Sequence, residues 1–183
     1  MEIRFLSGNE QKILETELIL GAAGAKVIAV NRKIHELQTD DARKLVEDKL
    51  VKAFKEVGRE VFVEHTGLHL AGLKNFPGGL TEIFWETLQA DAFADLVARL
   101  ETPAVIARTT IAYCDGRRFH FFDGEINGMI SKSPAGPRDF QWDCVFVPDG
   151  ENRTFAEMGK EKNRHSMRRI ALDKFAKFLE SSR

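Results

Sequence analysis

The chain has 183 residues, a length expected for a single domain spanning residues 1–183. Hydrophobic residues make up 43% and charged residues 30%, which excludes a largely disordered chain because there is enough apolar material for a core. The net charge of −1 argues against a nucleic-acid partner, and no apolar run reaches the roughly 20 residues that cross a bilayer. Two cysteines, without a zinc spacing or a signal peptide, indicate a reducing, cytoplasmic location.

In the first half of the chain, the spacing of apolar residues predicts alternating strands and helices. In chain order, the expected elements are a strand over 2–6, a helix over 11–20, a strand over 27–30, a helix over 42–57 and a strand over 60–64. Thr39 is the expected N-cap of the second helix, with Asp40 and Asp41 in its first turn, and Gly58 is expected to end it.

In the second half, strands follow one another without helices between them. The expected elements are helices over 81–88 and 91–100, strands over 104–113, 119–122, 125–131 and 144–147, and a helix over 162–179. Turns are expected at Asp115-Gly116 and Asp123-Gly124. The pattern predicts an α/β fold with a mixed central sheet flanked by helices.

Two segments follow strands and carry polar residues suited to chemistry. Residues 7–12 place small residues before a helix, where backbone amides and Lys12 can hold a phosphate. Residues 63–68 place Glu64 and His65 at the expected carboxyl end of a strand, the edge where α/β proteins bind ligands. Either segment alone is also consistent with an ordinary solvated turn.

Two later segments combine aromatic, acidic and basic residues. Phe140 and Trp142 offer flat faces to a heterocycle, and Asp143 can accept a hydrogen bond from a ring N–H, although two aromatics are also typical of a core. Residues 154–169 contain Thr-Phe-Ala-Glu-Met, then Lys-Asn and Ser-Met-Arg. Basic side chains in such a segment are equally typical of a solvated helix start.

Together, these segments resemble the inosine triphosphate pyrophosphatase family. That family is similar in its Thr/Ser-Gly-Asn-x-x-Lys opening, its Glu-Asp-Thr/Ser-Gly-Leu, its Phe-Gly-Tyr/Trp-Asp-Pro, and its Thr-x-Ala-Glu-Met before Lys-Asn-x-x-Ser-His-Arg. The counterparts here begin at Ser7, Glu64, Phe140 and Thr154, and the resemblance runs from Phe5 to Phe178 with compatible spacing.

The resemblance implies two lobes around a nucleotide-binding cleft and, usually, a homodimer. It implies an enzyme that hydrolyses purine nucleoside triphosphates, such as those of hypoxanthine and xanthine, to the monophosphate and pyrophosphate. It also implies a Mg²⁺ cofactor, with Mn²⁺ as an alternative here, and neither a nucleic-acid nor a membrane partner.

The family's functional positions map onto this chain residue by residue. The resemblance implies that Glu36, Glu64 and His65 manage the metal and the attacking water, with Glu64 and His65 as the catalytic pair. The implied substrate-binding residues are Ser7, Gly8, Asn9, Lys12, Lys49, Thr66, Phe140, Gln141, Trp142, Asp143, Lys162, Ser166, Met167 and Arg168.

The most serious departure from the family is His65, which stands where the family has an Asp. An imidazole can act as a general base near neutral pH, but it is a poor Mg²⁺ ligand and suits Mn²⁺ or Zn²⁺ better. Three outcomes remain open: hydrolysis with another base or metal, a weakened enzyme, or a nucleotide-binding protein without turnover.

Other departures surround the expected cleft. Met167 replaces a His that faces the purine in the family, which predicts relaxed base discrimination. Gln141 replaces a Gly and Cys144 a Pro, so a changed loop conformation is expected. Glu82 stands where some relatives carry a basic residue. Altered base specificity is therefore a further alternative.

Overall fold

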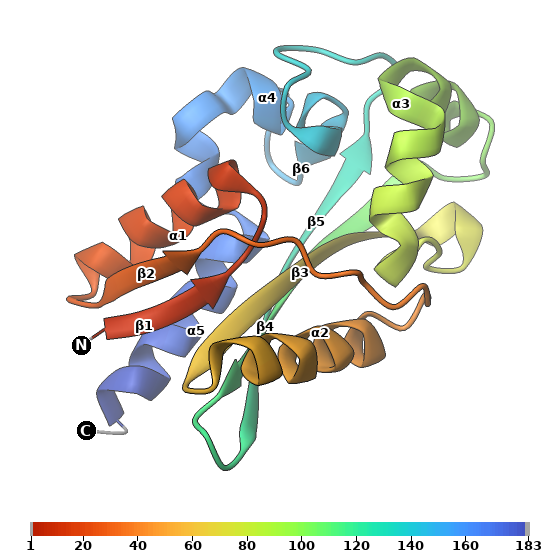
Figure 1. The fold of residues 1–183 in the computed structure, drawn as a ribbon. Coiled ribbons are helices and arrows are strands. Elements are labelled where there is room, and N and C mark those ends of the chain that lie inside the picture. The colour runs from red at the N-terminus through yellow and green to blue at the C-terminus, as the bar shows by residue number, and fades with distance from the viewer. Residues whose placement is uncertain (1, 182–183) are drawn as a thin grey trace.

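The computed structural model describes residues 2–181, whose strands form one sheet in the order β2-β1-β3-β4-β5-β6 (Figure 1). The strands are β1 (Glu2–Leu6), β2 (Lys26–Val30), β3 (Val61–Leu70), β4 (Ala104–Cys114), β5 (Phe119–Ile130) and β6 (Phe146–Pro148). β1 pairs in parallel with β2 and β3, whereas the pairs from β3 to β6 are antiparallel. The expected mixed sheet is confirmed.

Helices cover both faces of this sheet. They are α1 (Glu10–Ala22), α2 (Ala42–Val57), α3 (Thr81–Ala98), α4 (Phe155–Met158) and α5 (Met167–Ser181), with short 3-10 turns η1 (Ala71–Leu73), η2 (Gly78–Leu80), η3 (Gln141–Cys144) and η4 (Gly159–Arg164). The α3 helix is interrupted at Gln89 (φ 57°, ψ 178°), between the two expected helical stretches. None of the helices within residues 2–181 is long and apolar enough to cross a membrane.

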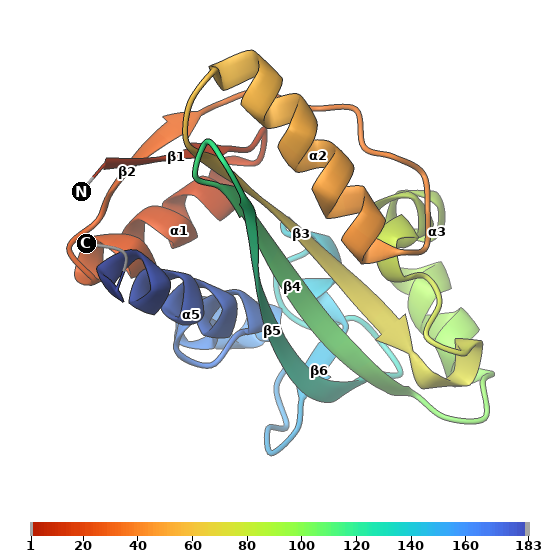
Figure 2. The same cartoon turned by 90° about the horizontal axis from the view of Figure 1, so that it is seen from below.

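Alternate residues of β3 face opposite sides of the sheet, as the strand pleat requires. Phe62 packs against Phe175 of α5, with ring centroids 5.0 Å apart. Val63 belongs instead to a buried cluster with Leu50 of α2. Figure 2 shows α2 on one face of the sheet and α1 and α5 on the other. This alternation decides which neighbours the polar residues farther along β3 can reach.

Two strand limits expected from the sequence are wrong. The predicted turn at Asp123-Gly124 lies inside β5, where both residues pair with β4. A Cβ at Gly124 would sit 2.0 Å from the Met167 carbonyl oxygen. Glycine therefore permits close approach of α5 rather than a turn. The strand predicted to end at Glu64 continues to Leu70, paired with β4 along its length.

The expected N-cap of α2 is also wrong. Asp41, rather than Thr39, caps the helix: its carboxylate accepts hydrogen bonds from the N–H groups of Arg43 and Lys44 at 3.0 and 3.1 Å. The Thr39 hydroxyl accepts the Asp41 N–H at 3.2 Å and stabilises the preceding turn. The predicted end at Gly58, which adopts a left-handed conformation, is confirmed.

The last helix and the last strand begin later than expected. α5 starts at Met167 rather than Lys162, because the Ser166 hydroxyl accepts the Arg169 N–H at 3.1 Å and caps it. Lys162 lies in η4. Cys144 ends η3 instead of opening a strand, so β6 begins at Phe146.

Tyr113 gives a direct test of packing between the sheet and α5. It is the chain's single tyrosine, it is buried, and it contacts Phe175. Burial, with Glu60 and Asp115 nearby, raises its pKa to about 12. The unfolded phenol ionises near pH 10, so the free energy of unfolding should fall as pH rises from there toward 12.

We expect the phenolate absorbance of the native protein to titrate near pH 12, and that of the urea-unfolded chain about two units lower. Tyr113→Phe should reduce the alkaline loss of stability. Native and unfolded proteins that titrate together would show that Tyr113 is not packed as described.

Candidate active site

The candidate active site lies where the pairing between β1 and β3 ends. These strands pair at Phe5 and Phe62, and β1 then ends at Leu6 while β3 continues to Leu70. The turn after β1 leads directly into α1, where the Asn9 side chain caps the helix by accepting the Lys12 N–H at 3.0 Å. The Ser7 hydroxyl accepts the Asn9 N–H at 3.2 Å. The N-terminus of α1 and Lys12 therefore lie at the place where β1 ends beside β3, an arrangement that favours the binding of anions.

A cavity of about 190 Å³ lies where the pairing between β1 and β3 ends. Its lining residues are Ser7, Gly8, Asn9, Lys12, Arg32, Lys33, Ile34, Glu36, Lys49, Glu82 and Gln141. Four of them are cationic and two are anionic. Glu82 forms an ion pair with Lys33 at 3.6 Å, so it partly offsets the positive charge as its position in the sequence suggested. The cavity suits an extended anion such as a polyphosphate.

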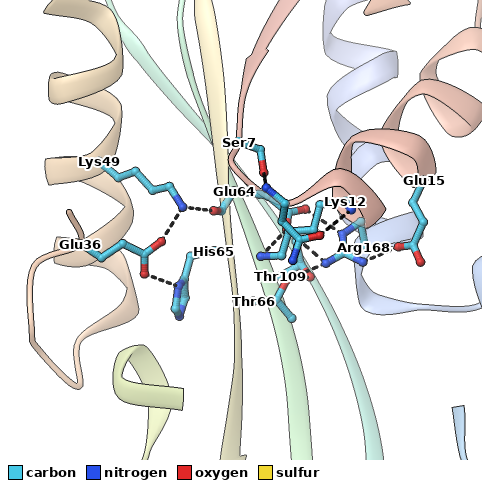
Figure 3. A network of polar contacts seen from close by, with 11 residues as sticks. Ser7, Lys12, Glu15, Glu36, Lys49, Glu64, His65, Thr66, Thr109 and Arg168 are labelled. Carbon is cyan, nitrogen blue, oxygen red and sulfur yellow. Dashed lines mark hydrogen bonds and ion pairs between the residues drawn. The ribbon is translucent and has the colours of Figure 1, made fainter. Parts of the chain in front are cut away.

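On the α2 side of β3, three polar side chains gather (Figure 3). Lys49 donates to Glu36 Oε1 at 2.5 Å and to the Glu64 carbonyl oxygen at 3.1 Å. His65 Nδ1 lies 3.8 Å from Glu36 Oε2, and its buried Nε2 has no hydrogen-bond partner among the described residues. Burial opposes ionisation of Glu36, but His65 and Lys49 outweigh it and hold its pKa well below the usual range.

On the α5 side, Glu64 sits between two cations. Its Oε1 lies 2.9 Å from Lys12 Nζ, and Arg168 donates to its Oε1 and Oε2 at 3.1 and 2.8 Å. Arg168 also forms a hydrogen-bonded ion pair with Glu15. Burial would raise the pKa of Glu64, yet Arg168 and Lys12 lower it strongly. Glu64 and Glu15 in turn raise the pKa of Arg168 despite its burial.

A second, larger cavity of about 510 Å³ lies between α1 and the segment that contains η3 and η4. Phe140, Asp143 and Lys162 line it together with Glu15. Lys162 Nζ is 4.3 Å from the Phe140 ring centroid and forms a buried ion pair with Asp143. Burial raises the pKa of Asp143, and Lys162 opposes this rise. A flat ring with hydrogen-bonding edges fits such a lining.

The remaining expected residues are buried at or near this second cavity. Trp142 is 2% exposed, and its ring packs against Phe146 with centroids 5.5 Å apart. The indole ring is therefore largely covered by contacts within the hydrophobic core. Thr66 shares a 2.7 Å hydroxyl hydrogen bond with Thr109. Ser166, the cap of α5, and Met167 line a narrow gap beside Trp142.

Sequence reasoning did not single out Glu15, Arg32 or Lys33. Glu15 follows Lys12 by three residues in the same helix, a spacing that places both side chains on one face. The spacing from Lys12 could therefore have indicated that Glu15 belongs to the site. Arg32 and Lys33 follow β2, the edge at which a parallel sheet presents ligand-binding loops.

The residues fit a divalent cation that arrives with a phosphate. No cluster of three or more His, Cys, Asp or Glu side chains that could hold a metal occurs within residues 2–181. Mg²⁺ is commonly held by one or two carboxylates together with substrate phosphates and water. The ionised Glu36 borders the phosphate-sized cavity and meets this requirement. Both oxygens of Glu64 are engaged by Lys12 and Arg168, so its role as a metal ligand stays a prediction.

Comparisons with known proteins agree with the sequence motifs. The sequence pattern of the Ham1 family matches residues 3–178. The chain belongs to the Ham1 family. One relative, from Saccharolobus solfataricus, is named dITP/XTP pyrophosphatase and is 32% identical, covering 99% of this chain and 95% of its own. Another Ham1 relative, from Candida glabrata, is named inosine triphosphate pyrophosphatase and is 36% identical, with 97% of each chain covered.

Solved structures show the same fold. The Ham1 protein of Coxiella burnetii has a TM-score of 0.82, with 21% identity and 99% of both chains covered. The Ham1 protein of Staphylococcus aureus has a TM-score of 0.81, also with 21% identity, over the full length of both chains. The expected family and fold class are therefore confirmed.

Proposed function

We propose that this chain, acting as a single domain, is a nucleoside triphosphate pyrophosphatase that cleaves deaminated purine nucleotides to the monophosphate and pyrophosphate. The observation that carries the proposal is the cationic cavity around Lys12 and Lys49 beside a cavity lined by Phe140, Asp143 and Lys162. The names of the Ham1 relatives support hydrolysis over nucleotide binding without turnover.

The proposed chemistry begins with charge neutralisation. Lys12, Lys49 and the N–H groups at the start of α1 hold the triphosphate and stabilise negative charge that develops as the bond between the α- and β-phosphates breaks. Mg²⁺ or Mn²⁺, held through Glu36 and the phosphates, supplies Lewis acidity when bound. Glu64 acts by positioning Lys12 and Arg168, which it contacts directly.

We propose that Glu36 and His65 together accept the proton that the attacking water loses. Glu36 borders the cavity and stays ionised, and His65 Nδ1 lies 3.8 Å from its carboxylate. Glu36 orients the water, and the imidazole takes up the proton through the pair. The proposal thus gives His65 the water chemistry that the sequence resemblance implied for this position.

We propose that hydrogen-bond donors in the ring-sized cavity determine which nucleotide base the protein prefers. Lys162 lines the ring-sized cavity, and its ammonium group can donate hydrogen bonds but cannot accept them. A 6-oxo group accepts such bonds, whereas the 6-amino group of adenine would face them with another donor. In a panel of ITP, XTP, GTP and ATP, we expect kcat/KM for ITP and XTP to exceed that for ATP by at least about 100-fold. Tight nucleotide binding without pyrophosphate release would favour the rival, a binding protein without turnover.

His65 predicts an unusual metal preference. A carboxylate at position 65, beside Glu36, would add the kind of ligand that Mg²⁺ prefers, so we expect His65→Asp to shift the ratio of the rates in Mn²⁺ and Mg²⁺ about tenfold toward Mg²⁺. His120→Asn, on the distant strand β5, serves as the matched control. A ratio unchanged by His65→Asp would remove His65 from the metal and water chemistry.

The proposal extends to location and assembly. Both cysteines are free and buried, as in proteins of a reducing cytoplasm. We also propose a homodimer, which light scattering at micromolar concentration would test directly. A nucleoside triphosphate is the proposed partner, and neither nucleic acid nor membrane is part of the proposal.

A further inference from the structure

Gln141 occupies the boundary between the two parts of the site. It lines the 190 Å³ cavity that contains Lys12 and Lys49. It also lines a narrow gap of about 10 Å³. Phe140 and Lys162 border both that gap and the 510 Å³ cavity. If a bound molecule placed its phosphates in the first cavity and its ring in the second, its middle portion would lie beside Gln141.

The backbone of Gln141 is unusual for a residue with a side chain. Its φ is 42°, in the left-handed region where glycine is favoured. Its carboxamide makes no hydrogen bond to any residue of the described part of the chain, although its carbonyl oxygen accepts weakly from Cys144 Sγ at 3.9 Å. A strained conformation with a free polar side chain at a cleft points to a role in the site.

We propose that Gln141 determines sugar specificity, its carboxamide bonding to the 2′-hydroxyl of a bound ribonucleotide. In a nucleoside triphosphate the sugar is the portion between phosphates and base, so it would lie near Gln141, which borders the phosphate-sized cavity and the narrow gap that Phe140 and Lys162 also line. A carboxamide offers donors and an acceptor, which match a hydroxyl group. This inference rests on the proposed function and adds a preference for ribonucleotides over 2′-deoxyribonucleotides.

The test compares wild type, Gln141→Gly and Gln141→Ala with ITP and dITP. We expect KM for ITP to rise about three- to tenfold in both variants, as for one lost hydrogen bond, with kcat little changed. The preference for ITP over dITP should fall by the same factor. Inhibition by tripolyphosphate, which has no sugar, should be unchanged. Gln141→Gly removes the positive-φ strain, so the variant should fold at least as well as wild type.

Gln89→Gly is the matched control, because Gln89 also has a positive φ but lies at the exposed break in α3. It should leave both substrates unaffected. An unchanged ITP/dITP ratio in both Gln141 variants would overturn the inference, as would a change in Gln141→Gly alone, which would indicate a backbone effect. If the wild type neither binds nor cleaves any nucleoside triphosphate, the proposed function itself fails.

Discussion

Lys12→Met is expected to lower kcat/KM for ITP by about 10²- to 10³-fold, the usual loss when one preorganised donor to a developing negative charge is removed. Lys12 lies at the start of α1, lines the phosphate-sized cavity and has only 13% of its side chain exposed. Steady-state kinetics with ITP measure the effect. The fold should persist, because Glu64 keeps its two hydrogen bonds to Arg168.

Lys26→Met is the matched control for this loss. Lys26 pairs with Glu2 on the surface, and 73% of its side chain is exposed. Its replacement should leave kcat/KM unchanged. If Lys12→Met lost no more activity than Lys26→Met, Lys12 would not contact the phosphates and the cationic cavity would have another use.

Glu64→Gln is expected to destabilise the protein by about 3–5 kcal/mol, because removal of one partner from a buried ion pair leaves uncompensated charge. Glu64 is 3% exposed and neutralises both Lys12 and the buried Arg168. Urea unfolding should show a lower midpoint with an unchanged m-value. Adding Arg168→Met to Glu64→Gln should recover part of the stability, since the buried guanidinium, which Glu64→Gln deprives of one of its two carboxylate partners, is then absent.

Glu2→Gln removes a carboxylate of the same kind from the exposed pair with Lys26, and its urea midpoint should match that of the wild type. A loss below about 1 kcal/mol in Glu64→Gln would mean that water screens the cluster. The buried charge network would then not be a structural requirement of the site.

Much of the fold was predictable because local signals agreed with tertiary structure. The alternation in β1, the apolar spacing of α2 and the left-handed Gly58 each depend on neighbouring residues alone. Gly124 was misread because its small size serves α5, which packs against it from more than 40 residues away. The extent of β3 was missed because β4 supplies its hydrogen bonds. Long-range packing is not encoded in a local pattern.

The sequence predicts candidate residues for the site, but it does not predict how they are arranged. Ordered motifs indicated Lys12, Glu36 and Lys49, which line one cavity in the structure, and Arg168, which lines the narrow gap beside Trp142. Adjacent residues Glu64 and His65 were expected to act together, yet the pleat of β3 sends them to opposite sides, as Figure 3 shows. Under the proposed function, Glu64 therefore positions Lys12 and Arg168, while His65 takes part in the water chemistry on the other side of the strand.

The position of phosphate cleavage tests the central claim most directly. Purified protein would be incubated with ITP and Mn²⁺ or Mg²⁺, and the products separated by anion-exchange chromatography. Phosphates held by Lys12 and Lys49, with the base beside Phe140, predict inosine monophosphate and pyrophosphate in equal amounts. Inosine diphosphate and orthophosphate as first products would contradict the account.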